Sequence, residues 1–176
     1  MTSTPAAAGP VTGSDHLPAG DPVGAPTGAP VGAPAGKRSA GEGGKWSGRT
    51  VSVLLYSDDP DTRAAVQLAV GPRPAADLPR LRWVECATPA AVISHVDEGG
   101  LELLILDGEA VPAGGMGLCK QFKDEIYQCP PILVLTGRPQ DAWLATWSRA
   151  DFAVPHPLDP VAVADAVASL LRHRLG

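Results

Sequence analysis

The stretch LELLILDGEA, residues 101–110, places an aspartate at the end of an apolar run. Residues 101–106 are nearly all large aliphatic residues, a pattern typical of a strand buried on both faces of a parallel sheet. Asp107 follows that run directly. Because burying a carboxylate is costly unless a partner compensates it, we expect donors or a cation beside Asp107. The sequence therefore predicts a functional edge where this strand ends.

Strand-like and helix-like segments alternate on both sides of this stretch. Apolar runs typical of strands occupy residues 50–57, 81–86, 101–106, 130–136 and 151–155. Helical spacing or a helix start follows each run, at about 60–70, 89–98, 115–126, 139–149 and from 160 onward. Five strands, each followed by a helix, predict an α/β fold with a doubly wound parallel sheet and helices on both faces.

The first 48 residues differ in composition from the rest. They hold 11 of the 20 glycines and 7 of the 19 prolines, and VGAPTGAPVGAPAG at 23–36 repeats a Gly-Ala-Pro unit. Such a segment buries too little apolar surface to offset the entropy of an ordered chain. We therefore predict a disordered tail over residues 1–48 and a folded domain over residues 49–176.

Charge and composition argue against several functions. The tail carries three acids and three bases, so the net charge of −5 lies on the folded part. Without a basic stripe to neutralise phosphates, no direct nucleic-acid partner is expected. Neither a signal peptide nor a run of membrane-spanning length is recognisable, so we expect no membrane insertion. Cys86, Cys119 and Cys129 lack CxxC spacing, which predicts reduced, mostly buried thiols in a cytoplasmic protein.

Polar residues follow four of the five predicted strands. Asp58 and Asp59 come after the first strand and Asp107 after the third. Thr136 closes the fourth strand, and His156 follows the fifth. The carboxyl ends of parallel strands lie at one edge of a sheet, where doubly wound proteins bind their ligands. Carboxylates that gather there repel one another unless a cation shares them, and an all-oxygen set favours Mg²⁺.

Each of these residues also has a purely structural interpretation. Asp59 can cap the helix that follows it, and Asp107 can start a turn. Thr136 can cap the next helix, and His156 can be an ordinary loop residue. Their combination, in this order and at these strand ends, favours a site over four unrelated structural roles.

The segment 50–174 resembles the receiver domain of two-component response regulators, in particular the stand-alone receivers of actinobacterial type. The matching motifs are SDDPDTR (57–63), LLILDGEAVP (103–112), LVLTG (133–137) and VPHPLDP (154–160). The resemblance implies a flavodoxin-like fold with five strands in the order 2-1-3-4-5. It also implies a signalling protein rather than an enzyme, and we expect no output domain on this chain.

The resemblance further implies a role for each site residue. Asp107 is the phosphoacceptor, and it receives a phosphoryl group from a sensor histidine kinase. Mg²⁺ is held by Asp58, Asp59, Asp107 and the backbone carbonyl of Glu109. Thr136 hydrogen-bonds the phosphoryl oxygens and reports the event to the surface. The expected partners are therefore this kinase and an unidentified output protein.

Two positions depart from the family pattern. His156 stands where the family has a lysine that pairs with the phosphoryl group, and a histidine is shorter and mostly neutral at pH 7. It can either substitute for that lysine or mark a loss of phosphorylation. Ala153 stands where the family usually has an aromatic residue, and strand alternation points the neighbouring Phe152 to the other face.

Two tryptophans bear on the partner surface. Trp143 and Trp147 are spaced i, i+4 in the predicted helix 139–149. Either both pack on the sheet, or one lies on the face that receivers use for dimerisation and output. The second alternative predicts a possible homodimer through the fourth helix and fifth strand.

Three functions remain open from the sequence. The first is a single-domain response regulator phosphorylated on Asp107. The second is a pseudo-receiver, a protein-interaction module that acts without phosphorylation. The third is a small enzyme, either a phosphatase of the haloacid dehalogenase type or a flavin-binding protein. The phosphatases place their acids after the first strand, and the two aspartates after the first strand here would repel a flavin phosphate.

Overall fold

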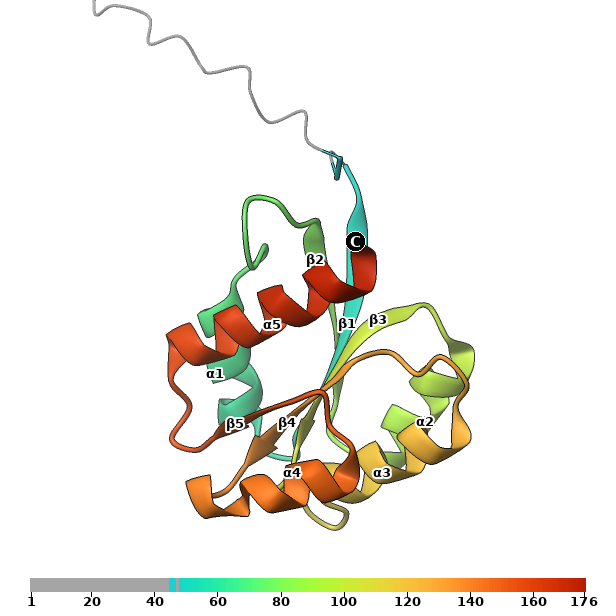
Figure 1. Ribbon diagram of the computed structural model, residues 1–176, viewed down its shortest axis with the longest axis vertical. Coiled ribbons are helices and arrows are strands. Elements are labelled where there is room, and N and C mark those ends of the chain that lie inside the picture. The colour runs from blue at the N-terminus through green and yellow to red at the C-terminus, as the bar shows by residue number, and fades with distance from the viewer. Residues whose placement is uncertain (1–44, 47) are drawn as a thin grey trace, which may run out of the picture. The chain divides into compact units, whose positions relative to one another are not determined.

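The computed structural model describes residues 45, 46 and 48–176 (Figure 1). The disordered tail predicted over residues 1–48 lies, apart from residues 45, 46 and 48, outside the described residues. The strands are β1 (Thr50–Tyr56), β2 (Arg80–Cys86), β3 (Leu101–Asp107), β4 (Ile132–Thr136) and β5 (Phe152–Pro155). The helices are α1 (Pro60–Val70), α2 (Pro89–Glu98), α3 (Gly115–Glu125), α4 (Ala142–Ser148) and α5 (Pro160–Leu175), with a 3-10 turn at Pro139–Asp141.

The five strands form one parallel sheet in the order β2-β1-β3-β4-β5, which confirms the predicted class and strand order. From β1 the chain moves outward to β2 and then returns to β3 on the other side of β1. The strand order therefore reverses between β1 and β3. In open parallel sheets, ligands bind beyond the carboxyl ends of the strands at this point.

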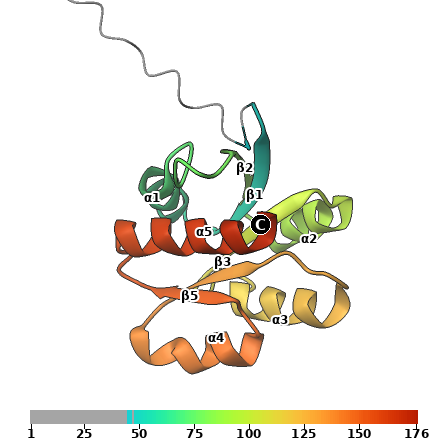
Figure 2. The ribbon, with the colours of Figure 1, turned by 45° about the horizontal axis from the view of Figure 1, so that its top comes forward.

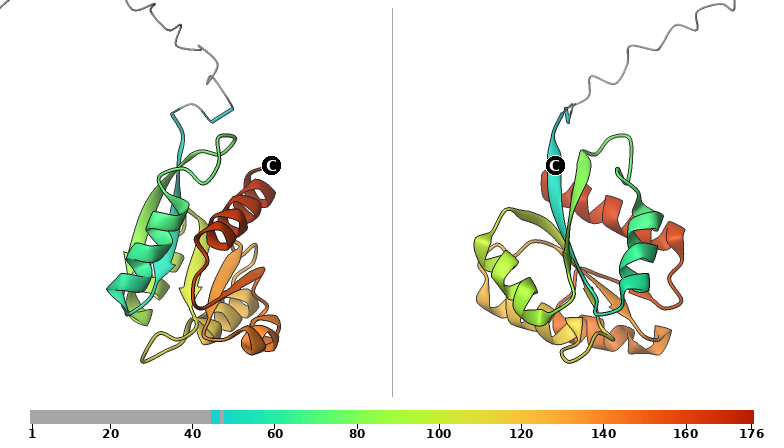
Figure 3. Two further views of the ribbon diagram at one scale, coloured as in Figure 1. Left: turned by 90° about the vertical axis from the view of Figure 1, so that its left-hand side faces the viewer. Right: turned by 180° about the vertical axis from the view of Figure 1, so that it is seen from behind.

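Helices cover both faces of the sheet. α1 and α5 pack on one face, against β-strand residues that include Leu55 and Ile105. α2 and α3 pack on the other face, against residues that include Leu54 and Leu106. Figures 2 and 3 show this layering, with α4 beside α3. Side chains alternate along each strand, so a continuous apolar run supplies both cores at once.

Local signals predict the helix starts correctly. Asp59, Thr88 and Asp159 each accept hydrogen bonds from backbone N–H groups at the start of a helix, and each precedes a proline in its first turn. A proline there loses no helical hydrogen bond, because its N–H would be unpaired in any case. In the described residues, none of the helices is long and apolar enough to cross a membrane.

The segment predicted as one helix over 139–149 is divided in the structure. A 3-10 turn precedes α4, and Arg149 ends α4 in the left-handed conformation, with φ at 64°. Trp143 and Trp147 on α4 are 66% and 54% exposed, and Phe152 on β5 is also exposed. The alternative in which both tryptophans pack on the sheet is therefore wrong.

The cysteines agree with the predicted buried thiols. Cys86 and Cys119 are buried and Cys129 is partly buried, and all three are free. Burial raises the pKa of Cys119 to about 11. A thiol with a raised pKa carries little reactive thiolate at neutral pH, so Cys119 is a packing residue.

Replacing Ile105 tests the position of the core. Ile105 is fully buried in the central strand, and Ile105→Ala is expected to lower the free energy of unfolding by about 2–5 kcal/mol because it leaves a cavity. Leu68→Ala on α1 is the control, since Leu68 is 86% exposed and its truncation should cost less than about 0.5 kcal/mol. Urea unfolding measures both values. Equal losses in the two variants would contradict this placement of β3.

Candidate functional site

Asp107 closes β3 and is only 4% exposed. Its Oδ2 accepts a hydrogen bond from the Ser57 hydroxyl at 2.7 Å, and its Oδ1 accepts one from the Glu109 N–H at 3.0 Å. The two donors come from different segments, the end of β1 and the loop after β3. They compensate part of the desolvation of the carboxylate, as its predicted position required.

Ser57 is fully buried at the end of β1. Its Oγ accepts a hydrogen bond from the Asp59 N–H at 3.1 Å, and its carbonyl oxygen accepts one from Arg63 Nη1 at 2.6 Å. Ser57 was not among the site residues expected from the sequence. The signal was present in Asp59-Pro60, because a helix cap at Asp59 leaves Ser57 and Asp58 at the strand end.

The two neighbouring aspartates have different environments. The Asp59 carboxylate caps α1 and accepts hydrogen bonds from the Asp61 N–H at 3.0 Å, the Thr62 N–H at 3.2 Å and the Thr62 hydroxyl at 2.7 Å. These hydrogen bonds lower the pKa of Asp59, and the one from the Thr62 hydroxyl has a larger effect than the one from the Asp61 N–H. Asp58 is exposed, and no side-chain hydrogen bond to another described residue engages its carboxylate. Asp58 is therefore the member of the pair that is open to a ligand.

Tyr56 ends β1, directly before Ser57 and the cleft residue Asp58. The pKa of Tyr56 is raised, mainly by burial and to a smaller extent by the negative charges of Asp58 and Asp107. Both carboxylates are thus close enough to affect the same phenol. The Tyr56 hydroxyl donates a hydrogen bond to the Ala113 carbonyl at 2.7 Å, and so ties the loop after β3 to β1.

The predicted acids meet in one cleft of about 260 Å³. Its lining residues are Asp58, Asp59, Thr62, Asp107, Glu109, Gly137 and His156. Five of these seven were expected from the sequence, and Thr62 and Gly137 were not. Acids from the ends of β1 and β3 therefore face a common opening with the histidine that follows β5.

Thr136 lies beneath this opening rather than on its wall. It is 1% exposed, and its hydroxyl donates to the Arg138 carbonyl at 3.4 Å. The Thr136 carbonyl accepts a hydrogen bond from the His156 N–H at 2.7 Å, so β4 sets the position of the half-buried His156. The hydroxyl is thus oriented toward its own loop in this structure.

Glu109 extends across the cleft to the loop after β4. A Cβ atom on residue 137 would lie only 2.5–2.7 Å from the Glu109 carboxyl group. Real Cβ atoms do not make contacts this short, so glycine at 137 allows Glu109 its position. The backbone N–H of Glu109 donates a hydrogen bond to Asp107, and the exposed carboxylate of Glu109 borders the opening.

The Mg²⁺ site predicted at Asp58, Asp59, Asp107 and the Glu109 backbone carbonyl stays a prediction. Within residues 45, 46 and 48–176, no group of three or more His, Cys, Asp or Glu side chains is arranged to hold a metal ion. The Asp59 carboxylate caps α1 and also lines the cleft. The Asp58 and Asp107 carboxylates line the cleft together, and Mg²⁺ needs few carboxylates because it keeps several waters.

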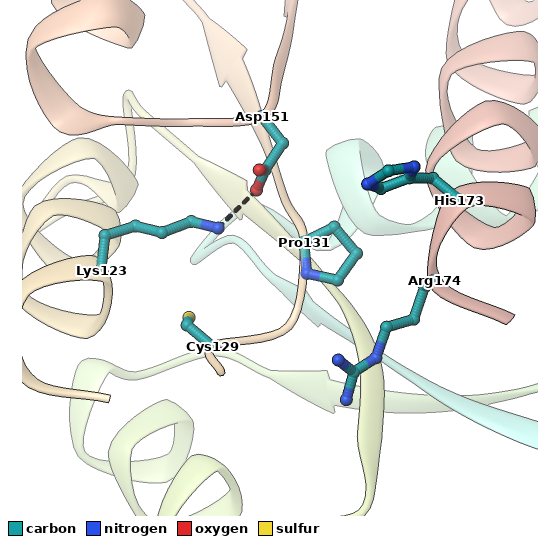
Figure 4. Close-up of a pocket in the computed structure, with 6 residues that line it drawn as sticks. All are labelled: Lys123, Cys129, Pro131, Asp151, His173 and Arg174. Atoms are coloured by element: carbon teal, nitrogen blue, oxygen red, sulfur yellow. Dashed lines mark hydrogen bonds and ion pairs between the residues drawn. The ribbon is translucent and has the colours of Figure 1, made fainter. Parts of the chain in front are cut away.

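A second pocket of about 260 Å³ lies at the opposite edge of the sheet, where β4 and β5 begin (Figure 4). Lys123 Nζ forms an ion pair with Asp151 at 2.6 Å there, and Arg174 Nε pairs with Glu102 at 3.0 Å. No residue predicted for the site lines this pocket. The ion pairs hold α3 and α5 against the strand starts.

Solved structures with the same fold come from signalling proteins. A two-component response regulator from Clostridium difficile is 18% identical, with a TM-score of 0.57 over 69% of this chain and 96% of that one. The receiver domain of a Francisella response regulator is 12% identical, with a TM-score of 0.60 over 70% and 98%. A chemotaxis protein of Vibrio cholerae is 17% identical, with a TM-score of 0.56 over 70% and 100%. The described part of the chain therefore has the fold of a receiver domain.

Sequence relatives give the family. No family model matches the chain. Response regulatory proteins from two strains of Mycobacterium tuberculosis are each 57% identical over 126 residues, which cover 72% of this chain and 95% of each relative. This chain belongs to the response regulators of two-component systems.

The different environments of Asp58 and Asp59 predict different effects on stability. Asp59→Ala should lower the melting temperature at pH 7 more than Asp58→Ala, because only Asp59 caps α1. The contribution of Asp59 is complete above the ordinary carboxyl pKa of about 3.9 and is lost as pH falls through its lowered folded pKa. Thermal unfolding between pH 7 and pH 2 measures the difference. A gap that stays constant over this range would contradict the capping role.

Proposed function

We propose that this response regulator accepts a phosphoryl group on Asp107 from a sensor histidine kinase. The observation that carries the proposal is the Asp107 carboxylate, which is held by two hydrogen bonds and opens onto a cleft that Asp58 also lines. In the transfer, an Asp107 oxygen attacks phosphorus. The bond from phosphorus to the kinase histidine nitrogen breaks, and that nitrogen keeps the electron pair.

Mg²⁺ is the proposed cofactor. Asp58, Asp107 and the backbone carbonyl of Glu109 would hold it, and Asp59 would contribute only if its carboxylate left the helix cap. When bound, the ion supplies charge neutralisation for the phosphoryl oxygens. The residues of the chain supply the rest, because phosphoryl transfer depends mainly on positioning and on stabilising charge.

Thr136 and His156 are proposed to contact the phosphoryl group. The weak 3.4 Å hydrogen bond from Thr136 to the Arg138 carbonyl is readily exchanged for one to a phosphoryl oxygen. His156 lines the cleft and can donate a hydrogen bond from its ring to the same group.

Acetyl phosphate tests the acceptor. Incubation with acetyl phosphate and Mg²⁺ is expected to add one phosphoryl group to the full chain, as measured by mass spectrometry. Asp107→Asn should abolish the gain, because an amide is not a nucleophile for phosphorus. It keeps an oxygen that can accept from Ser57 or Glu109, so the fold should be retained. Absence of phosphorylation in the unaltered protein would refute the proposal.

A phosphorylation-independent pseudo-receiver is the second candidate. The observation that favours it is the satisfied state of Asp107, whose two oxygens already have donors from the protein. His156 at the position of the family lysine also favours it. Such a module would bind its partner with the same affinity whether or not acetyl phosphate was present.

The surface formed by Trp143, Trp147 and Phe152 is the proposed contact region for output. These three exposed aromatic residues lie on α4 and β5, and exposed aromatic clusters are typical anchors of protein interfaces. The partner is either an output protein or a second copy of the chain. We also propose a cytoplasmic location, which fits a kinase donor and a protein output.

Tryptophan substitution tests this surface. If phosphorylation promotes a homodimer, Trp147→Ala should weaken association by about tenfold or more, as expected for an aromatic anchor. Leu68→Ala is the control, because Leu68 is 86% exposed on α1, a helix that packs against α5 rather than on the face with α3. Analytical ultracentrifugation with and without acetyl phosphate measures the effect. A dimer equally weakened by both substitutions would contradict the proposed surface.

A further inference from the structure

Ser57 is the direct neighbour of Asp107 across the sheet. In the register of β1 and β3, Tyr56 pairs with Leu106, so the next residues along the two strands are Ser57 and Asp107. Both are buried, with Ser57 fully buried. The place beside the acceptor carboxylate is thus filled by a small neutral side chain.

The direction of the hydrogen bonds at Ser57 is determined. The Asp59 N–H can only donate, so at 3.1 Å it uses Ser57 Oγ as an acceptor. The hydroxyl proton is then available for Asp107 Oδ2, which lies 2.7 Å away and can only accept when ionised. A hydroxyl that donates to a carboxylate makes a short, charge-assisted hydrogen bond.

The backbone of Ser57 is held by hydrogen bonds on both its carbonyl and its N–H. Arg63 Nη1 donates to the Ser57 carbonyl at 2.6 Å, and Arg63 Nε pairs with Glu85 on β2 at 3.3 Å. The Ser57 N–H donates to the Cys86 carbonyl at 3.3 Å, also on β2. The donor that faces Asp107 is therefore held in place by contacts to α1 and β2.

We propose that Ser57 is the positioning residue for the acceptor carboxylate, and that its hydroxyl orients Asp107 before a cation or phosphodonor binds. The inference rests on the proposed function of Asp107. It adds that a neutral donor, rather than a third acid, stands beside the acceptor. The resting cleft therefore needs no cation to keep Asp107 in place, and two carboxylates give Mg²⁺ a weak site.

Two substitutions separate these consequences. Ser57→Ala removes the donor to Asp107 and also the acceptor of the Asp59 N–H, so Asp107 loses one of the two bonds that fix its orientation. Ser57→Asp places a carboxylate against the Asp107 carboxylate, and two such groups in a buried position repel unless a cation lies between them. The first variant should lose rate, and the second should gain affinity for Mg²⁺.

Phosphorylation kinetics test the positioning role. With acetyl phosphate at saturating Mg²⁺, Ser57→Ala should lower the maximal rate by about tenfold to a hundredfold, as small misplacements of reacting groups do. The concentration of acetyl phosphate at half-maximal rate should stay unchanged. Ser57→Cys, which keeps a weak donor of similar size, should give an intermediate rate. This graded rescue would not follow from a purely structural role.

Binding of Mg²⁺ alone provides a readout that needs no phosphorylation. Calorimetric titration should give Ser57→Asp an affinity for Mg²⁺ about tenfold higher than that of the unaltered chain, because the site gains a third carboxylate. The melting temperature of this variant should rise with added Mg²⁺ more than that of the unaltered chain. If Ser57→Ala failed to fold, these two measurements and Ser57→Cys would still decide the inference.

Ser52→Ala is the matched control. Ser52 is another buried serine of β1, and its hydroxyl accepts from Arg82 at 2.7 Å and 3.2 Å, at the other end of the strand. The phosphorylation rate and the Mg²⁺ affinity of Ser52→Ala should equal those of the unaltered chain. If the unaltered chain is phosphorylated and Ser57→Ala is phosphorylated at the same rate, the positioning role is wrong and the proposed function stands. An unaltered chain that is never phosphorylated would instead refute the proposed function.

Discussion

The buried carboxylate of Asp107 depends on donors that only the folded sheet can supply. One donor is the hydroxyl of Ser57, which directly follows β1, and the other is the backbone N–H of Glu109 in the loop after β3. Both are in place because β1 pairs in parallel with β3 and the two strands end at the same level. A shift of one residue in that register would turn Asp107 toward a helix-covered face and leave its charge unpaired.

The three consecutive polar residues after β1 have different roles at this edge of the sheet. Ser57 donates to the acceptor, Asp58 faces the opening, and Asp59 caps α1. A helix N-terminus attracts negative charge, and the cap satisfies that attraction locally. Asp59 thus has a structural role at the same edge where it lines the cleft.

A short structural path connects the cleft to the exposed aromatic residues. The Thr136 hydroxyl donates to the carbonyl of Arg138, and Arg138 directly precedes the 3-10 turn that leads into α4. Trp143 and Trp147 lie on that helix. Under the proposed function, a change in the partner of the Thr136 hydroxyl would act on the loop that precedes α4.

The sequence by itself determined the order of the strands and helices, the helix starts at Asp59, Thr88 and Asp159, and the place of Asp107. These features depend on apolar periodicity and capping, which involve residues close together in the chain. The tertiary structure alone decided that Ser57 rather than Asp59 faces Asp107, and that the tryptophans of α4 are exposed. Such choices depend on strand register and on which helix face meets the sheet, and residues far apart in sequence set both.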